Sequence, residues 1–254
     1  MKTKKLIICV VIWASFFCGA TAFLAPGGSN ATVGHDLYAG LLEKYVKRGV
    51  VDYNSFKSEE ASLDKYLKIL EETDVKKLAR KGQFAFYVNA YNAWTIKLIL
   101  SGYPGVKSIK DLGSLFKSPW KKQLARIDGD IMTLDHIEHN ILRPRFKDPR
   151  AHFAINCASK GCPPLRSEPY RADILDRQLD EMTRAFINDT LRYRLEGQTL
   201  YVSSIFKWFS EDFNDDVVGF FLKYAQKDFK KKLEESKSNI RVKYLNYDWS
   251  LNGK

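Results

Sequence analysis

The sequence predicts a mainly helical α+β domain with a small antiparallel sheet. Three observations support this fold class: helical spacing of apolar residues fills most of the chain, two hairpin patterns interrupt it, and no regular alternation of strands with helices is present. Such an alternation would instead indicate a parallel sheet. With 254 residues, about 45% of them hydrophobic, the chain is long enough to bury one core of its own.

Eight segments carry helical patterns. The segment 84–100 is apolar around most of the helix, which predicts burial on nearly all sides. Asn89 and Asn92 lie within it, and buried amides destabilise a protein unless they form hydrogen bonds. The expected helices span 35–47, 58–72, 74–80, 84–100, 135–143, 173–188, 205–209 and 216–232.

The helix expected over 135–143 has signals at both ends. Asp135 and Glu138 lie three positions apart in a capping-box pattern, which predicts its start. Pro144 lacks a backbone N–H and predicts its end.

Strands are expected in three places. Hairpins are predicted around Asp128-Gly129 and around Glu196-Gly197-Gln198, because both turns lie between short apolar runs. A closing strand is expected over 240–247.

The first 22 residues have the layout of a secretory signal peptide. A lysine-rich start precedes an apolar run over 6–17, and Ala20-Thr21-Ala22 is a small-residue cleavage site. An uncleaved anchor is the alternative. With cleavage, residues 1–22 are the signal peptide, residues 23–34 a flexible leader and residues 35–252 a single domain. We then expect an exported protein, periplasmic or secreted, without a stable membrane span.

The balance of charges is basic. The formal net charge is +11, and loss of the three lysines in residues 1–22 would leave +8. Such a protein can meet anionic envelope polymers or lipid headgroups, although plain solubility is the simpler explanation. The composition excludes a collagen-like fibre, and no nucleic-acid-binding module is recognisable. Nucleic acid is therefore not an expected partner.

Most of the rare reactive side chains lie close together in the sequence, and they suggest a cysteine nucleophile. A thiol attacks a carbonyl as thiolate, so Cys157 would need a base such as His139. Glu138 cannot easily orient its neighbour His139, because adjacent helical residues point about 100° apart; it either orients another group or only caps the helix. The cluster consists of Asp135, His136, Glu138, His139, His152, Cys157 and Cys162.

Two further interpretations of this cluster remain open. Without residues 1–22 the chain keeps only Cys157 and Cys162, five positions apart, and the spacing alone favours a disulfide. His136 and His139 could share a helix face in a zinc site, yet the His-Glu-x-x-His and Cys-x-x-Cys spacings are missing from the sequence. We predict neither a metal nor a cofactor.

Five motifs together resemble those of the domain of unknown function 547 family, in an exported bacterial-type member. The likeness covers nearly all of the chain after residue 34. The motifs are Phe84-Ala85-Phe86-Tyr87-Val88-Asn89-Ala90-Tyr91-Asn92-Ala93, the helix 135–143, the segments 152–159 and 162–165, the residues Lys207-Trp208-Phe209 with Asp212-Phe213, and the closing segment 247–252.

The resemblance implies a fold and a site. It implies kinship with papain-like thiol hydrolases, in a permuted arrangement because His139 here precedes Cys157. Cys157 would match the nucleophile, His139 the base and Glu138 a third polar member. The substrate would be bound by Asn89, Asn92 and Arg143, with Asn89 and backbone N–H groups stabilising an oxyanion.

The leading functional hypothesis is an exported thiol-dependent hydrolase or acyl transferase acting on an amide, peptide or thioester. Its substrate is not identified by the sequence; a peptide or an envelope component is the expected class. The alternative is a non-catalytic envelope binding or structural domain with a Cys157–Cys162 disulfide. Thiol redox chemistry by the cysteine pair is a third possibility.

Overall fold

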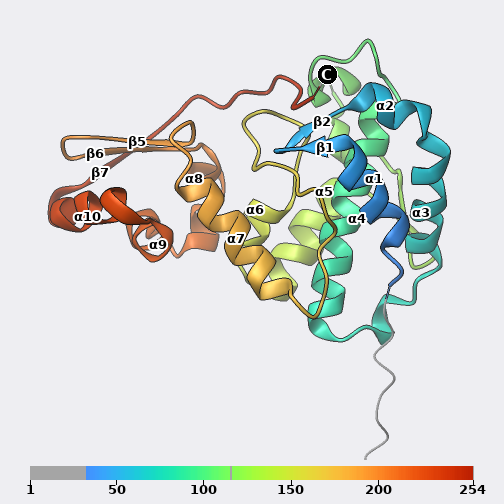
Figure 1. Cartoon of the computed structure of the whole chain (residues 1–254), viewed down its shortest axis with the longest axis horizontal. Coiled ribbons are helices and arrows are strands. Elements are labelled where there is room, and N and C mark those ends of the chain that lie inside the picture. The colour runs from blue at the N-terminus through green and yellow to red at the C-terminus, as the bar shows by residue number, and fades with distance from the viewer. Residues whose placement is uncertain (1–32, 115, 254) are drawn as a thin grey trace, which may run out of the picture.

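The computed structural model describes residues 33–114 and 116–253 (Figure 1). Helices dominate this part of the chain and the strands form small sheets, which confirms the α+β class. The expected signal peptide and nearly all of the expected leader lie outside the described residues. The α-helices are α1 (Asp36–Tyr45), α2 (Tyr53–Ser58), α3 (Glu60–Glu72), α4 (Arg80–Leu100), α5 (Leu134–His136), α6 (Ala151–Ala154), α7 (Leu175–Ile187), α8 (Ile205–Trp208), α9 (Val217–Tyr224) and α10 (Lys227–Ser236).

Within residues 33–114 and 116–253, short 3-10 helices and one π-helix connect these elements, and seven strands complete them. The 3-10 helices are η1 (Val75–Lys77), η2 (Ile109–Leu112), η3 (Pro119–Lys121), η5 (Ser210–Phe213) and η6 (Lys237–Asn239), and the π-helix is η4 (Ile137–Phe146). The strands are β1 (Val46–Lys47), β2 (Val50–Val51), β3 (Ala125–Ile127), β4 (Asp130–Met132), β5 (Tyr193–Glu196), β6 (Thr199–Val202) and β7 (Arg241–Tyr244).

Helix α4 forms the centre of the hydrophobic core. It contacts α3 and η4, and nearly every side chain from Phe84 to Leu100 is buried. This confirms the prediction that the apolar pattern of this segment marks a helix covered on almost all sides. The segment 58–72, predicted as one helix, forms α3 and the end of α2.

The strands pair mainly in antiparallel hairpins; the two at Asp128-Gly129 and Glu196-Gly197-Gln198 were predicted, and the pair β1–β2 was not. β1 pairs with β2, β3 with β4 and β5 with β6, all antiparallel. The closing strand β7 instead runs parallel to β6, with Thr199 opposite Arg241 and Val202 opposite Tyr244. Figure 1 shows this third sheet with α9 and α10 at one end of the molecule, and α1 and α3 at the other.

Three predicted helices differ from the structure. The helix expected over 74–80 is only the 3-10 helix η1, and Arg80 already belongs to α4. The single helix expected over 216–232 is divided into α9 and α10, because Ala225 is extended and Lys227 has a left-handed φ of +50°. The helix expected to end at Pro144 continues to Phe146. A π-helix bonds i to i+5, and Pro144, which has no backbone N–H, leaves one of these bonds unmade without ending the helix.

The predicted capping box at the start of this region was also wrong. The side chain of Thr133, which precedes α5, accepts a hydrogen bond from the His136 N–H at 2.9 Å. Thr133 therefore caps the first turn, and Glu138 is not needed there. The freed Glu138 lies in η4, the kind of helix that is often found at functional sites.

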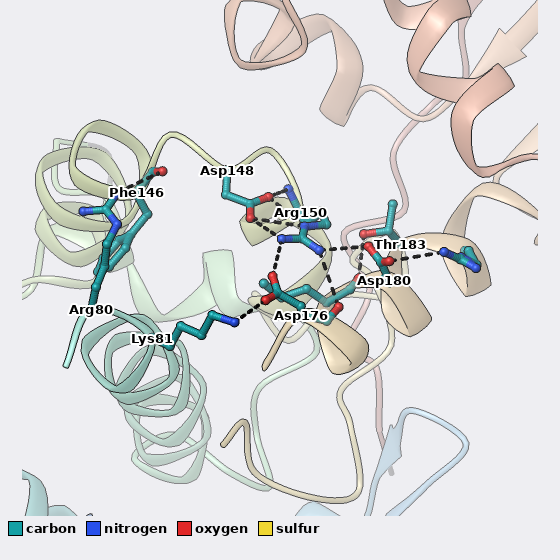
Figure 2. A network of polar contacts seen from close by, with 10 residues as sticks. Arg80, Lys81, Phe146, Asp148, Arg150, Asp176, Asp180 and Thr183 are labelled. Carbon is teal, nitrogen blue, oxygen red and sulfur yellow. Dashed lines mark hydrogen bonds and ion pairs between the residues drawn. The ribbon is translucent and has the colours of Figure 1, made fainter. Parts of the chain in front are cut away.

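An arginine-centred group of ion pairs, here called the Arg150 cluster, connects the loop after η4 to α7 (Figure 2). The Arg150 guanidinium contacts Asp148 at 2.7 Å and both Asp176 and Asp180 at 2.9 Å. Lys81 of α4 contacts Asp176 at 2.6 Å. The loop after η4, α7 and α4 are thereby held together. Within the described part of the chain, no helix is long and apolar enough to span a membrane.

Candidate functional site

A cavity of about 240 Å³ lies between η4, the loop around Cys157, α8 and the C-terminal segment. Three predicted site residues, Glu138, His139 and Cys157, line it together. They come from two segments that are separated by the whole of α6. The other lining residues that matter below are Tyr91, Trp120, Cys162, Trp208, Tyr247 and Trp249.

Cys157 and Cys162 are joined by a disulfide in the wall of this cavity. Their Cα atoms are 6.2 Å apart, within the usual range for disulfides. Cys162 is buried and Cys157 is only half-buried, so Cys157 is the more accessible sulfur. The Cys157 N–H also donates a hydrogen bond to Cys162 Sγ at 2.9 Å. Of the two states that the sequence left open, the structure contains the bridged one.

Two hydroxyl groups surround the Cys157 sulfur. Its Sγ lies 3.2 Å from Ser159 Oγ and 3.3 Å from the Tyr247 hydroxyl. Ser159 also donates a hydrogen bond to the Tyr247 hydroxyl at 3.1 Å. Burial raises the pKa of Tyr247 to about 12, so its hydroxyl stays protonated near neutral pH. Because the Ser159 hydrogen is directed at Tyr247, the Tyr247 hydroxyl is the one that can donate a hydrogen bond to a sulfur anion.

The two asparagines of α4 bind backbone groups, and neither is among the residues that line the cavity. Asn92 donates to the Ala154 carbonyl at 3.0 Å and accepts from the Asn156 N–H at 2.8 Å. Asn89 makes the same two kinds of bond to the backbone of Tyr170, both at 2.8 Å. Both buried amides thus have hydrogen-bond partners. Asn92 holds the backbone segment that leads to Cys157.

Glu138 is the most strongly perturbed acid of the cavity. Burial raises its pKa to about 7, although a hydrogen bond from the Tyr91 hydroxyl at 3.3 Å and the charge of Arg143 oppose that rise. The nearby charges of Asp135 and Asp212 raise it further. A carboxyl group with such a pKa can both accept and release a proton near neutral pH.

His139 is held by Arg143. The Arg143 Nη1 lies 3.1 Å from His139 Nδ1, and because guanidinium only donates, Nδ1 carries no proton. The neutral ring therefore bears its proton on Nε2, which lies 3.9 Å from Asp135 Oδ1. Burial lowers the pKa of His139, which favours this neutral form.

Arg143 belongs to a second arginine-centred group, here called the Arg143 cluster. Its guanidinium contacts Asp212 at 2.5 Å and also pairs with Glu211. Asp212 additionally contacts the buried ring of His152 through Nε2 at 2.6 Å. Burial alone would raise the pKa of Asp212, but the hydrogen bonds from His152 and Arg143 lower it to about 2. Asp212 is thus ionised and orients Arg143.

Four aromatic side chains form another wall of the cavity. The ring centroids of Tyr247 and Trp249 are 4.5 Å apart, and those of Trp208 and Tyr247 are 4.9 Å apart. Trp120 meets Trp249 edge-on at 5.8 Å. Aromatic faces of this kind bind apolar groups and planar groups, such as amides, by stacking.

The structure thus places some predicted site residues in the cavity beside the disulfide and others outside it. Arg143 lines a neighbouring cavity of about 440 Å³ that also includes His139, Lys147 and Asp212. His136 is exposed on α5. Sequence reasoning assigned no site role to Tyr91, Tyr247 or Asp212, although all three lie within the motifs that carried the family resemblance.

The residues that the structure describes include no group of three or more His, Cys, Asp or Glu side chains arranged to hold a metal ion.

Fold and site together define an α+β protein with an aromatic and acidic cavity beside a disulfide. Residues 75–187 match the family described as "Protein of unknown function, DUF547". The resemblance to that family is confirmed over this segment, which contains α4, η4 and both cysteines of the bridge. Neither a curated protein nor a solved structure matches the chain.

Proposed function

We propose that the protein is an exported thiol-dependent hydrolase or acyl transferase, with Cys157 as nucleophile. The observation that carries the proposal is the meeting of Cys157, Glu138 and His139 in one cavity. Glu138 has a pKa close to 7 there, and shifted pKa values of this kind are concentrated at functional sites. The substrate class is an amide, a peptide or a thioester.

The nucleophile becomes available when the bridge is reduced. An external dithiol would supply two electrons and two protons, so that the Cys157–Cys162 bond breaks, two thiols form and the dithiol becomes a disulfide. The half-buried Cys157 is the sulfur that a substrate can reach, whereas Cys162 is buried. Reduction would therefore switch the enzyme on.

Glu138 is the proton acceptor that we assign. The Nδ1 lone pair of His139 is occupied by Arg143, and the other ring nitrogen already bears the proton. A carboxylate with a pKa near 7 has no such restriction. His139 would instead donate a hydrogen bond from Nε2 to the substrate, which differs from the role of base that the sequence suggested.

The chemical sequence follows from these assignments. Glu138 takes the thiol proton, the Cys157 sulfur bonds to the carbonyl carbon, and the bond to the leaving group breaks as Glu138 returns the proton to that group. Water or another acceptor then attacks the resulting thioester and regenerates the thiol. The Cys157 N–H donates to Cys162 Sγ in the bridged state, and we assign it as the oxyanion donor after the bridge is reduced. Because His139 precedes Cys157, kinship with papain-like enzymes would require a permuted chain order.

Two serine variants test this proposal, because both break the bridge and only one removes the nucleophile. Iodoacetamide serves as the thiol probe and p-nitrophenyl acetate as the acyl probe. Wild type should react with both only after reduction. Cys162→Ser should react at Cys157 without reductant, whereas Cys157→Ser should lose the p-nitrophenol burst at least tenfold under both conditions. An equal burst in the two variants would overturn the assignment.

A non-catalytic binding domain is the second candidate. The aromatic wall and the bridge in the cavity support it, since a disulfide stiffens a binding surface and the aromatic side chains offer stacking faces. This function predicts that Cys157→Ser and Cys162→Ser lower the Tm alike. It also predicts no acylation after reduction, which separates it from the enzyme.

A further inference from the structure

Two segments beside the cavity, 107–114 and 116–122, are here called the lysine loop. Ser114 and Lys117 exchange backbone hydrogen bonds at 3.0 and 3.3 Å, which closes a turn. Gly113 lies so close to this turn that a Cβ there would be 2.9 Å from both the Lys117 carbonyl oxygen and the Pro119 ring. Phe116 lies within the turn, and its side chain is 98% exposed.

Four exposed lysines lie in the same loop as this phenylalanine. None of them forms an ion pair with an acid in the described part of the chain, and Lys110 lies 3.8 Å over the ring of Trp249. The carboxylate of Asp111 accepts hydrogen bonds from two backbone N–H groups, of Lys107 and Ser108. The loop therefore presents a surplus of positive charge. The four lysines are Lys107, Lys110, Lys117 and Lys121.

We infer that the lysine loop is a docking surface for an anionic lipid bilayer. Lysines near an anionic membrane are attracted by its surface potential, and an exposed aromatic side chain between them can enter the boundary between headgroups and acyl chains. A soluble polyanion would account for the lysines but leave Phe116 without a partner. The combination therefore favours a bilayer.

A second lysine-rich surface of this protein shows the contrast. Lys223, Lys227, Lys231 and Lys232 are exposed on α9 and α10. Acidic residues Asp228, Glu234 and Glu235 lie on the same helix as most of them, and neither α9 nor α10 carries a strongly exposed large apolar side chain. This surface has a similar number of cations but no apolar tip.

The lysine loop also lies at the edge of the cavity. Ser118 and Trp120 belong to the loop and line the cavity, and Trp120 packs against Trp249, the residue that Lys110 covers. The Lys107 carbonyl accepts a hydrogen bond from the Leu251 N–H, so the loop is attached to the C-terminal segment. Docking would hold the cavity next to the membrane, whatever reaction or binding takes place there.

Vesicle sedimentation tests this inference on protein purified after export from cells that express the full chain. Vesicles of phosphatidylcholine alone give the baseline, and vesicles that contain one third phosphatidylglycerol provide the anionic surface. At about 0.1 M salt we expect at least tenfold stronger binding to the anionic vesicles, decreasing as salt screens the charges. The variant K107Q/K110Q/K117Q/K121Q should lose at least tenfold of that binding, and Phe116→Ala at least threefold.

Two matched variants serve as controls. K223Q/K227Q/K231Q/K232Q removes the same number of charges from α9 and α10, and Leu191→Ala shortens a side chain that is 83% exposed in a different loop. Both should bind anionic vesicles within twofold of wild type. All of these positions are exposed, so an unchanged Tm checks the fold.

Three results would overturn the inference. The first is equal binding to neutral and anionic vesicles. The second is an equal loss in the two four-lysine variants, which would mean that net charge alone acts. The third is binding of soluble heparin that depends on the loop lysines but not on Phe116, combined with no binding to vesicles, which would identify a polyanion as the partner.

Discussion

The Arg150 cluster and the Arg143 cluster are built from the same chemistry and do different things. Both arginine side chains are 17% exposed, and both bind more than one carboxylate. The side-chain partners of Arg150 are three aspartates, one in its own loop and two on α7. Its ion pairs therefore hold that loop against α7 (Figure 2). Arg143 uses one donor on the ring of His139, which lines the candidate site.

The two clusters also differ in what remains when one carboxylate is lost. Arg150 keeps two aspartates when a third is lost. Asp212 has no such substitute in the Arg143 cluster, because it alone accepts from both the buried His152 and Arg143. The comparison shows that the function of an arginine cluster depends on which uncharged groups it orients.

Replacing the central carboxylate should have the largest effect on stability. We expect Asp212→Asn to lower the free energy of unfolding by about 2–3 kcal/mol, because His152 and Arg143 lose an ionised acceptor in a mostly buried place. Urea unfolding at pH 7 measures this loss.

Asp180→Asn is the matched control in the Arg150 cluster. It should cost less than about 1 kcal/mol, since Asp180 is more exposed and Arg150 retains Asp148 and Asp176. If Asp180→Asn costs as much as Asp212→Asn, the distinction between the clusters is wrong.

Glu138 in the candidate site and Asp176 in the Arg150 cluster should change the free energy of unfolding in opposite directions as the pH rises. The folded-state pKa of Glu138 is about 7, above its unfolded value of 4.5, so the native protein loses stability as the pH rises through this range. Glu138→Gln removes that loss and should stabilise the protein relative to wild type at pH 8, with little difference at pH 4. Thermal unfolding across pH 4–8 measures it.

Asp176 of the Arg150 cluster provides the opposite case. Hydrogen bonds from Lys81 and Arg150 lower its pKa, so its contribution is present above the unfolded pKa and is lost as the pH falls through the folded one. Asp176→Asn should therefore destabilise the protein at pH 8 and become neutral in acid. A gain of stability at pH 8 would contradict this.

The smallest effect that we predict is a change in the pKa of the His139 ring. Burial lowers its pKa most, and the charge of Arg143 lowers it further. Arg143→Met should therefore raise the pKa of His139 towards its ordinary value, whereas Arg150→Met should leave it unchanged. Titration of the ring signals by NMR, assigned with His139→Gln, tests the pair; equal shifts in both variants would show that Arg143 has no specific effect.

Much of the fold could be predicted because its signals are local. The all-round apolar pattern of 84–100 marked the central helix, and the turn at Asp128-Gly129 marked the hairpin β3–β4. The end at Pro144 was mispredicted, because a sequence pattern does not indicate that the helix will widen into π geometry. The break between α9 and α10 was missed as well, since the residues on both sides of it are helix-compatible.

The candidate site was predicted in part. Cys157, Glu138 and His139 stood out as rare reactive groups, and they do line one cavity. Their orientation did not follow from the pattern, because the hydrogen bond from Arg143 to His139 depends on how Asp212, 69 positions further along the chain, holds the guanidinium. Tyr247 lies 90 positions from Cys157 and could not be paired with it from spacing.

The sequence by itself determined the α+β class, the central helix, the hairpins and the possibility of a bridge across five positions. Each of these depends on periodicity or on neighbours within one segment, where backbone geometry limits the choices. Only the tertiary structure decided that β7 is parallel to β6, that the two asparagines hold backbone, and that the bridge lies in an aromatic and acidic cavity. Those features depend on which distant segments pack together, and local sequence patterns do not determine that. The same packing sets the burial and the nearby charges that raise the pKa of Glu138.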